Sequence, residues 1–162
     1  MTKTVVTSVL GTHGDVQPHV ALAVTLKKRG FRPIICATDD FEGFVTSYGV
    51  EFRGHGTDMR ELMKRTQMDD AAALSKLLYA PNLLREGQKM LKEAARRTWD
   101  AAQGADALIF AQTTTFCIDM AEALRIPALM VAFQPLNPTA EFPYFQYEVN
   151  PLSPLMYRFN RE

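Results

Sequence analysis

Apolar and polar positions along the chain form blocks whose spacing changes from strand-like to helix-like. The first two blocks, TVVTSVL (4–10) and RPIICAT (32–38), are β-branched and aliphatic, which is typical of strands buried in a parallel sheet. Three further strands are predicted at 50–58, 106–112 and 127–133. Most of these strands are separated by segments of helical spacing, so each strand is expected to reach the next through a helical crossover.

The predicted helical segments are 16–30, 39–49, a pair of helices divided at Pro81, and 114–125. Gly30 and Gly49 are expected to end the first two helices, and Asp39 or Asp40 to cap the second. In the helix after Pro81, we expect one apolar face made by Leu84, Leu91, Ala95 and Trp99. Five strands with helical crossovers predict an α/β fold with a doubly wound, Rossmann-like parallel sheet.

The size and the last part of the chain refine this picture. A chain of 162 residues with 47% hydrophobic content is expected to form a single domain over 1–162. Residues 134–154 are rich in proline and aromatic side chains, and they are expected to form a long ordered loop because disordered segments are poor in aromatics. The final stretch, LMYRFNRE, reads as the start of a truncated helix.

Charge and cysteine usage exclude several functional classes. Eighteen basic residues balance eighteen acidic ones, so the chain has no overall attraction to nucleic acid or to anionic lipid. Cys36 and Cys117 lie in apolar runs and are expected to be packed thiols of a reduced compartment. The chain starts directly with its first strand, without a signal-like leader or an apolar run of membrane-spanning length, so a cytoplasmic location is expected.

The turn after the first strand, GTHGD (11–15), has an unusual composition for a ligand-binding turn. A dinucleotide-binding turn needs G-x-G-x-x-G, and a P-loop needs four residues between its glycines followed by lysine; neither spacing is present. Asp15 also puts a carboxylate where a phosphate would otherwise meet the helix N-terminus. The turn therefore disfavours an anion at this place.

Two interpretations of this turn remain open from the residues alone. In the structural one, Asp15 is the N-cap of the first helix and His13 is a solvated loop residue. In the functional one, the Asp15 carboxylate accepts a proton from a hydroxyl, and His13 orients the same substrate or tunes the acid. Both side chains are expected at the carboxyl edge of the sheet, where open α/β sheets bind ligands.

The stretch GTHGDVQPHVALAVTLKKRGFRPIICATDDFEGFV resembles the N-terminal domain of family 28 glycosyltransferases and of the neighbouring sterol and antibiotic glucosyltransferases. Their pattern reads G-[TS]-R-G-D-V-Q-P followed by an A-L-A helix. The similarity continues more loosely into FQPLNPTAEFP and covers essentially the whole chain. Gly14 and Asp15 match the pattern, whereas His13 replaces its arginine, so the role of that arginine does not carry over.

The resemblance implies the N-terminal half of a GT-B fold, in which this domain holds the acceptor. It also implies an inverting hexosyl transfer, normally without a metal or other cofactor, with Asp15 as the general base. The donor, a nucleotide sugar such as UDP-glucose, would be bound mainly by a C-terminal domain that this chain lacks. The end of the fourth predicted strand, near Ala111, carries no aspartate for a histidine-based dyad.

The turns at the carboxyl edge also suggest an acceptor pocket for a bulky apolar alcohol. The candidate acceptor-binding residues are His13, Gly14, Thr113, Phe116, Phe133, Gln134 and Phe142. Phe116 and Phe133 have an alternative explanation as ordinary core between a helix and the sheet.

The expected function is therefore the acceptor-binding half of a glycosyltransferase, inactive by itself, whose acceptor is a lipid, a sterol or an antibiotic-like alcohol. Its expected partners are that acceptor and a donor-binding domain in the same or another chain, with no nucleic acid; peripheral contact with a membrane stays open. The alternatives are a non-catalytic binding module, one subunit of a split transferase, and an unrelated nucleotide-binding Rossmann domain.

Overall fold

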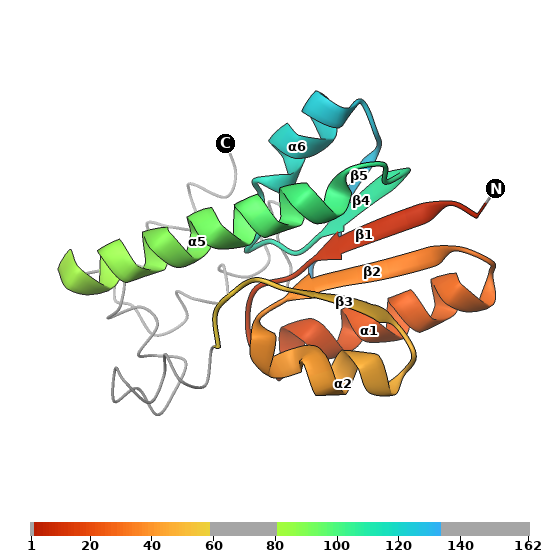
Figure 1. The fold of residues 1–162 in the computed structure, drawn as a ribbon, viewed down its shortest axis with the longest axis horizontal. Helices are drawn as coiled ribbons and strands as arrows, with labels where there is room; N and C mark the ends of the chain where they lie inside the picture. The colour runs from red at the N-terminus through yellow and green to blue at the C-terminus, as the bar shows by residue number, and fades with distance from the viewer. Residues whose placement is uncertain (1, 59–80, 134–162) are drawn as a thin grey trace, which may run out of the picture. The chain divides into compact units, whose positions relative to one another are not determined.

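The protein is described by a computed structural model, which defines residues 2–58 and 81–133 (Figure 1). Its centre is a parallel sheet of five strands in the order β3-β2-β1-β4-β5. The strands are β1 (Thr4–Ser8), β2 (Arg32–Ala37), β3 (Glu51–Gly54), β4 (Ala107–Phe110) and β5 (Ala128–Met130). The predicted α/β fold with a doubly wound parallel sheet is confirmed.

The middle of the sheet is β1, which pairs with both β2 and β4. At its end, Ser8 lies in register with Cys36 of β2 and with Phe110 of β4. From β1 the chain winds outward through β2 to β3 and then returns to the other side of β1 to form β4. The topological switch point therefore lies between β1 and β4, and the turns that follow these two strands meet at the carboxyl edge.

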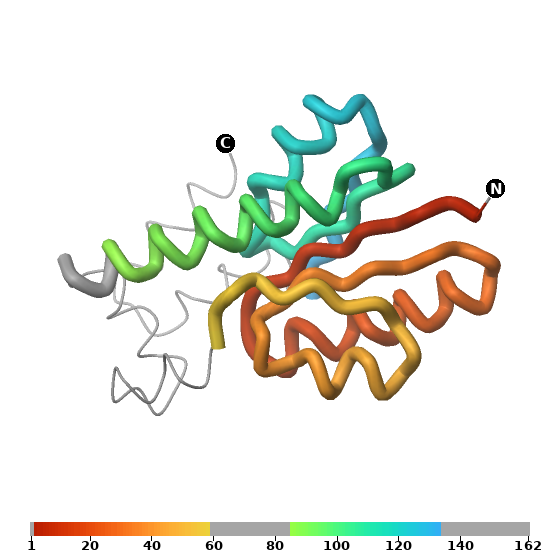
Figure 2. Tube along the Cα trace, in the orientation of Figure 1, coloured from red at the N-terminus to blue at the C-terminus, as the bar shows by residue number. Residues whose placement is uncertain are grey.

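Helices cover both faces of the sheet (Figures 1 and 2). One face carries α1 (His13–Lys28), followed along the chain by the short η1 (Asp39–Phe41) and α2 (Glu42–Ser47). The other face carries α5 (Pro81–Ala102) and α6 (Cys117–Leu124). Gly30 and Gly49, with φ of 85° and 67°, follow α1 and α2 as predicted. The N-cap of η1 is Thr38, so neither Asp39 nor Asp40 is its cap.

Each face of the sheet has its own apolar core. Under α1 and α2, the core includes Val16, Val20, Ile35 and Val45, all nearly or fully inaccessible to solvent. Under α5 and α6, the core includes the two thiols together with small and aliphatic side chains. Burial raises the pKa of both Cys36 and Cys117 to about 12, and both are free thiols. The prediction that these cysteines are packed thiols is confirmed.

The apolar face predicted for α5 is wrong. Leu91 and Trp99 are 42% and 37% exposed, whereas the side chains that face the sheet are Ala94, Thr98 and Ala102. Small side chains at these positions let the helix backbone approach the sheet closely, so the larger apolar residues lie on a flank that solvent reaches. Leu84 lies outside the side chains that the structure describes.

The chain divides into two units, 1–131 and 132–162. The helix predicted ahead of Pro81, the loop predicted at 134–154 and the terminal helix start lie outside the described residues. Within the described ranges, no helix has the length and apolarity to cross a membrane.

Candidate functional site

The turn between β1 and α1 places Asp15 at the carboxyl edge of the sheet. Thr12 is the N-cap of α1 and Asp15 is its third helical residue, so the two form a capping box. The backbone N–H of Thr12 donates to Oδ2 of Asp15 at 2.7 Å, and the Thr12 hydroxyl donates to the same oxygen at 3.1 Å. The N-cap is thus Thr12 and not Asp15. The Asp15 side chain points back toward the N-terminus of the helix, where its carboxylate accepts from Thr12.

Gly11 makes room for this carboxylate. A Cβ added at Gly11 would overlap the Asp15 side chain, which occupies the space that a larger residue would need. Gly14 differs, because a Cβ there would meet only the Thr12 hydroxyl at an ordinary contact distance of 3.7 Å. Of these two glycines of the turn, only Gly11 is required by the packing around Asp15.

His13 and Gly14 are both exposed beside the half-buried Asp15. The His13 ring rests on Phe44 of α2, with ring centroids 4.6 Å apart, and Phe44 in turn meets the edge of Tyr48 at 5.4 Å. His13 is therefore held by an aromatic neighbour from the next crossover, although it remains accessible. The sequence had indicated neither of these contacts.

The turn after β4 comes close to the turn after β1, as predicted for a switch point. The hydroxyl of Thr113 donates to the backbone carbonyl of Leu10, the residue before Gly11. Thr114 also ties the two segments together, because its buried hydroxyl donates to the Ser8 carbonyl at 2.8 Å. Thr113 is exposed and so lies on the surface near the Asp15 turn.

The aromatic candidates divide into different environments. Phe116 is half-buried and packs against the core under α5 and α6, which supports its alternative interpretation as a structural residue. Phe133 is 49% exposed and belongs to the second unit, so its place relative to Asp15 is not defined. Gln134 and Phe142 lie outside the described residues.

His19 lies one helical turn after Asp15 in α1 and was not predicted as a site residue. It is fully buried, and its Nδ1 lies 2.8 Å from the backbone carbonyl of Asp15, to which it donates. Burial lowers the pKa of His19, while the Asp15 carbonyl and carboxylate oppose that effect. His19 thus links the first two turns of α1, and its spacing of four residues from Asp15 was the available sequence signal.

A second buried histidine, His55, lies just beyond the end of β3. Its Nε2 is 3.3 Å from the hydroxyl of Thr98, which is 3.1 Å from the hydroxyl of Ser8. Burial, assisted by the positive charge of Arg97, lowers the pKa of His55 to about 4. Its Nδ1 has no hydrogen-bond partner among the described residues. This polar chain crosses the interior between β3, α5 and β1.

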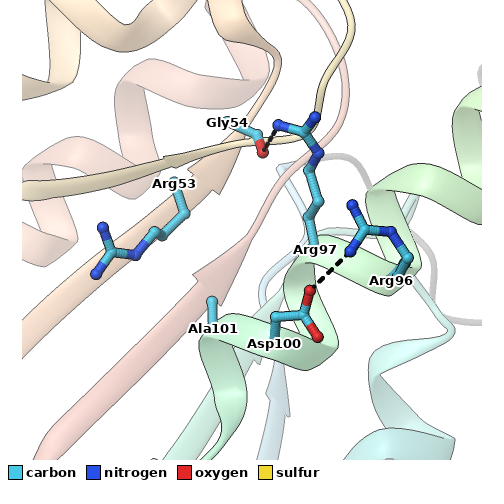
Figure 3. Close-up of a pocket in the computed structure, with 6 residues that line it drawn as sticks. All are labelled: Arg53, Gly54, Arg96, Arg97, Asp100 and Ala101. Carbon is cyan, nitrogen blue, oxygen red and sulfur yellow. Dashed lines mark hydrogen bonds and ion pairs between the residues drawn. The ribbon is translucent and has the colours of Figure 1, made fainter.

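A pocket of about 360 Å³ lies between α5 and β3. Its lining residues are Arg53, Gly54, Arg96, Arg97, Asp100 and Ala101 (Figure 3). The Arg97 guanidinium donates to the Gly54 carbonyl at 3.3 Å, and Arg96 donates to Asp100 at 3.0 Å.

The arginines of this pocket are paired with carboxylates. Glu93 accepts hydrogen bonds from Arg96 and Arg97, which lower its pKa to about 2. Arg53 bonds to Glu51 at 2.6 Å. Glu51 is shared with Arg32, and the bonds of the arginines to these carboxylates and to the Gly54 carbonyl hold the pocket together. We assign it a structural role in joining α5 to β3.

The edge around Asp15 presents a carboxylate, the exposed His13 ring and the Thr113 hydroxyl. Over residues 2–58 and 81–133, no three His, Cys, Asp or Glu side chains gather in a way that could hold a metal ion. Asp15 offers a carboxylate at the switch point, where the turns after β1 and β4 meet. Such an arrangement suits a reaction in which a bound hydroxyl loses its proton.

The fold is that of the N-terminal, Rossmann-like half of GT-B glycosyltransferases. The calicheamicin glycosyltransferase CalG4 superposes with a TM-score of 0.62 at 17% identity, over 90% of this chain and 34% of its own. SnogD from Streptomyces nogalater superposes with a TM-score of 0.61 at 14% identity, over 99% of this chain and 40% of its own. At such identities the likeness concerns the fold.

The chain belongs to glycosyltransferase family 28, whose N-terminal domain model matches residues 5–143. Among similar proteins, the sterol 3-beta-glucosyltransferase of Yarrowia lipolytica is 32% identical over 135 residues, which are 83% of this chain and 9% of that protein. The sterol 3-beta-glucosyltransferase of Leptosphaeria maculans is 31% identical over 145 residues, 87% of this chain and 10% of that protein. The chain thus spans about a tenth of the length of these relatives.

Proposed function

We propose that the chain is the acceptor-binding half of an inverting glycosyltransferase that moves a hexose from a nucleotide sugar to the hydroxyl of a sterol or a similar apolar alcohol. The observation that carries this proposal is the Asp15 carboxylate at the switch point, in a chain that belongs to family 28. The similarity to sterol 3-beta-glucosyltransferases supports a sterol as the first acceptor to test.

In the proposed reaction, Asp15 acts as the general base. As the acceptor oxygen forms its bond to the anomeric carbon, the acceptor O–H bond breaks and its proton passes to the Asp15 carboxylate. The bond from the anomeric carbon to the donor phosphate oxygen breaks on the opposite side, and its electron pair leaves with the nucleotide diphosphate. This attack inverts the anomeric carbon.

The neighbours of Asp15 are proposed to receive the acceptor. Gly14 has no side chain next to the carboxylate, and a Cβ at this position would meet only the Thr12 hydroxyl, at 3.7 Å. His13 is exposed yet held on Phe44, so it offers a ring nitrogen at a defined place. Thr113 offers a hydroxyl oxygen from the neighbouring turn. We propose these three residues as acceptor contacts, together with Phe133, Gln134 and Phe142.

The donor sugar is proposed to bind to a second domain, in the same chain or another, and this chain by itself is expected to bind an acceptor without transferring sugar. The buried free thiols fit a reducing compartment such as the cytoplasm. A non-catalytic binding module of the same fold would share acceptor binding but would not depend on Asp15 for any reaction.

The test replaces Asp15 by asparagine in the active transferase, in which this chain works with its donor-binding half. Asparagine keeps an oxygen that can accept from Thr12 but cannot take up the proton. Transfer to a sterol should fall by about a hundredfold to ten-thousandfold, the usual range for loss of a general base.

The matched control is Asp119→Asn, because Asp119 is likewise an acidic residue in the first turn of a helix, α6, but it is exposed and lies outside the proposed site. It should leave transfer unchanged. If Asp15→Asn transfers sugar as fast as this control, Asp15 is only a helix-capping residue and the proposed mechanism is wrong.

A further inference from the structure

The two hydrogen bonds from Thr12 to Asp15 end on the same carboxylate oxygen. The N–H and the hydroxyl of Thr12 both donate to Oδ2, at 2.7 and 3.1 Å. No hydrogen bond to Oδ1 occurs among the residues that the structure describes. The two oxygens of this carboxylate are therefore not equivalent, because Oδ2 accepts two hydrogen bonds from Thr12 and Oδ1 accepts none from the described residues.

The turn also restricts the orientation of the carboxylate. The place where Gly11 would carry a Cβ is filled by the Asp15 carboxylate, so the side chain packs against the Gly11 backbone. A rotation that exchanged the two oxygens would break both bonds from Thr12. The Asp15 side chain thus packs against the Gly11 backbone, and its Oδ2 accepts two hydrogen bonds from Thr12.

We propose that Thr12 is a positioning residue that occupies Oδ2 and so leaves Oδ1 of Asp15 as the oxygen that receives the acceptor proton. This inference rests on the proposed function, because it assigns a role to Thr12 in the same proton transfer. Thr12 does not touch the reacting atoms; it acts through the orientation of Asp15. The proposal requires the hydrogen bond from the Thr12 hydroxyl to Oδ2 in addition to the bond from the Thr12 backbone N–H.

A helix cap alone would have a different requirement. An N-cap residue is favoured for the helical N–H groups that it leaves satisfied, and glycine, which has no side-chain donor, is about as favourable there as threonine. The proposed role needs a hydroxyl that donates to Oδ2, which serine preserves and which valine removes at nearly the same size. The variants Thr12→Gly, Thr12→Val and Thr12→Ser therefore separate capping from positioning.

The experiment measures kcat and the acceptor KM of the active transferase for these three variants beside Asp15→Asn. Thr12→Val and Thr12→Gly should lower kcat by about tenfold to a hundredfold, the range for one lost hydrogen bond to a charged group, with KM within about twofold. Thr12→Ser should retain most of the activity of the unchanged protein. Full kcat in Thr12→Gly would overturn the proposal and make Thr12 a simple cap.

Two further outcomes keep the inference separate from the proposed function. If Asp15→Asn retains transfer, the proposed function fails whatever Thr12 does; if Asp15→Asn is inactive and Thr12→Val is not, only the role of Thr12 fails.

The geometry itself is tested by NMR on the 162-residue chain. The Thr12 amide proton should exchange slowly with solvent in the unchanged chain and much faster in Asp15→Ala; equal exchange rates in the two would contradict the bond to Oδ2.

Discussion

The buried histidine His55 should make the stability of this domain depend on pH. His55 is completely inaccessible to solvent and its pKa is lowered from 6.5 to about 4, mainly by burial and further by Arg97. The folded protein therefore keeps the ring neutral, while the unfolded chain takes up a proton below pH 6.5. Because the unfolded state binds more protons, stability is lost as the pH falls from about 6.5 to 4.

The size of the effect follows from the two pKa values. A pKa that falls from 6.5 to about 4 corresponds to roughly 3 kcal/mol of folding free energy once the pH is below both values. Between pH 7 and pH 5, the His55 contribution should decrease by about 2 kcal/mol. His19, whose pKa is also lowered by burial, adds to the loss in the same direction.

The assay is urea unfolding of the chain at pH 7 and at pH 5, followed by far-UV circular dichroism. His55→Gln has no group that titrates in this range, so its loss of stability between the two pH values should be about 2 kcal/mol smaller than that of the unchanged protein. The control is His13→Gln, because His13 is exposed. It should retain the full pH dependence.

The reasoning is refuted if His55→Gln and the unchanged protein lose the same free energy between pH 7 and pH 5. That result would mean that His55 is protonated in the folded state at pH 5 as readily as in the unfolded chain. The test compares the change in unfolding free energy from pH 7 to pH 5. A substitution that lowers stability by the same amount at both pH values leaves this change unaltered.

Two pairs of substitutions test the packing by the same unfolding assay at pH 7. Gly56→Ala should destabilise the chain by about 1–3 kcal/mol, because Gly56 has a φ of 77° and an added Cβ would meet the Arg97 guanidinium; Gly43→Ala, where nothing lies within 4 Å, should not destabilise it. Leu91→Gln should change stability by less than about 0.5 kcal/mol, whereas Ala94→Leu should cost about 1–3 kcal/mol by overpacking. A large cost for Leu91→Gln would contradict the observed face of α5.

The sequence by itself determined the features that depend on neighbouring residues. The strand and helix order follows from local apolar spacing, and Gly30 and Gly49 end their helices because glycine readily adopts positive φ. The position of Asp15 at the sheet edge also follows, since it lies just after the first strand of a parallel sheet. Its motif was specific enough to predict the family, and the match to family 28 confirms this.

The tertiary structure decided which surfaces meet, because the partners are distant along the chain. Every residue of β5 is apolar, whereas β1 contains two threonines and a serine; yet β1 is the strand that lies between two neighbours, and Leu129 of β5, at the sheet edge, is 60% exposed. The buried face of α5 is likewise chosen by the close approach of small residues to the sheet, which the periodicity of the larger ones did not indicate.

The same distinction holds at the site. Asp15 could be predicted because its motif is contiguous, and the capping box with Thr12 is also local. The bond from Thr113 to Leu10 and the chain from His55 through Thr98 to Ser8 join residues 43 to 103 positions apart. Such contacts exist only after the sheet has assembled, so folding rather than local pattern sets the surroundings in which the Asp15 carboxylate lies.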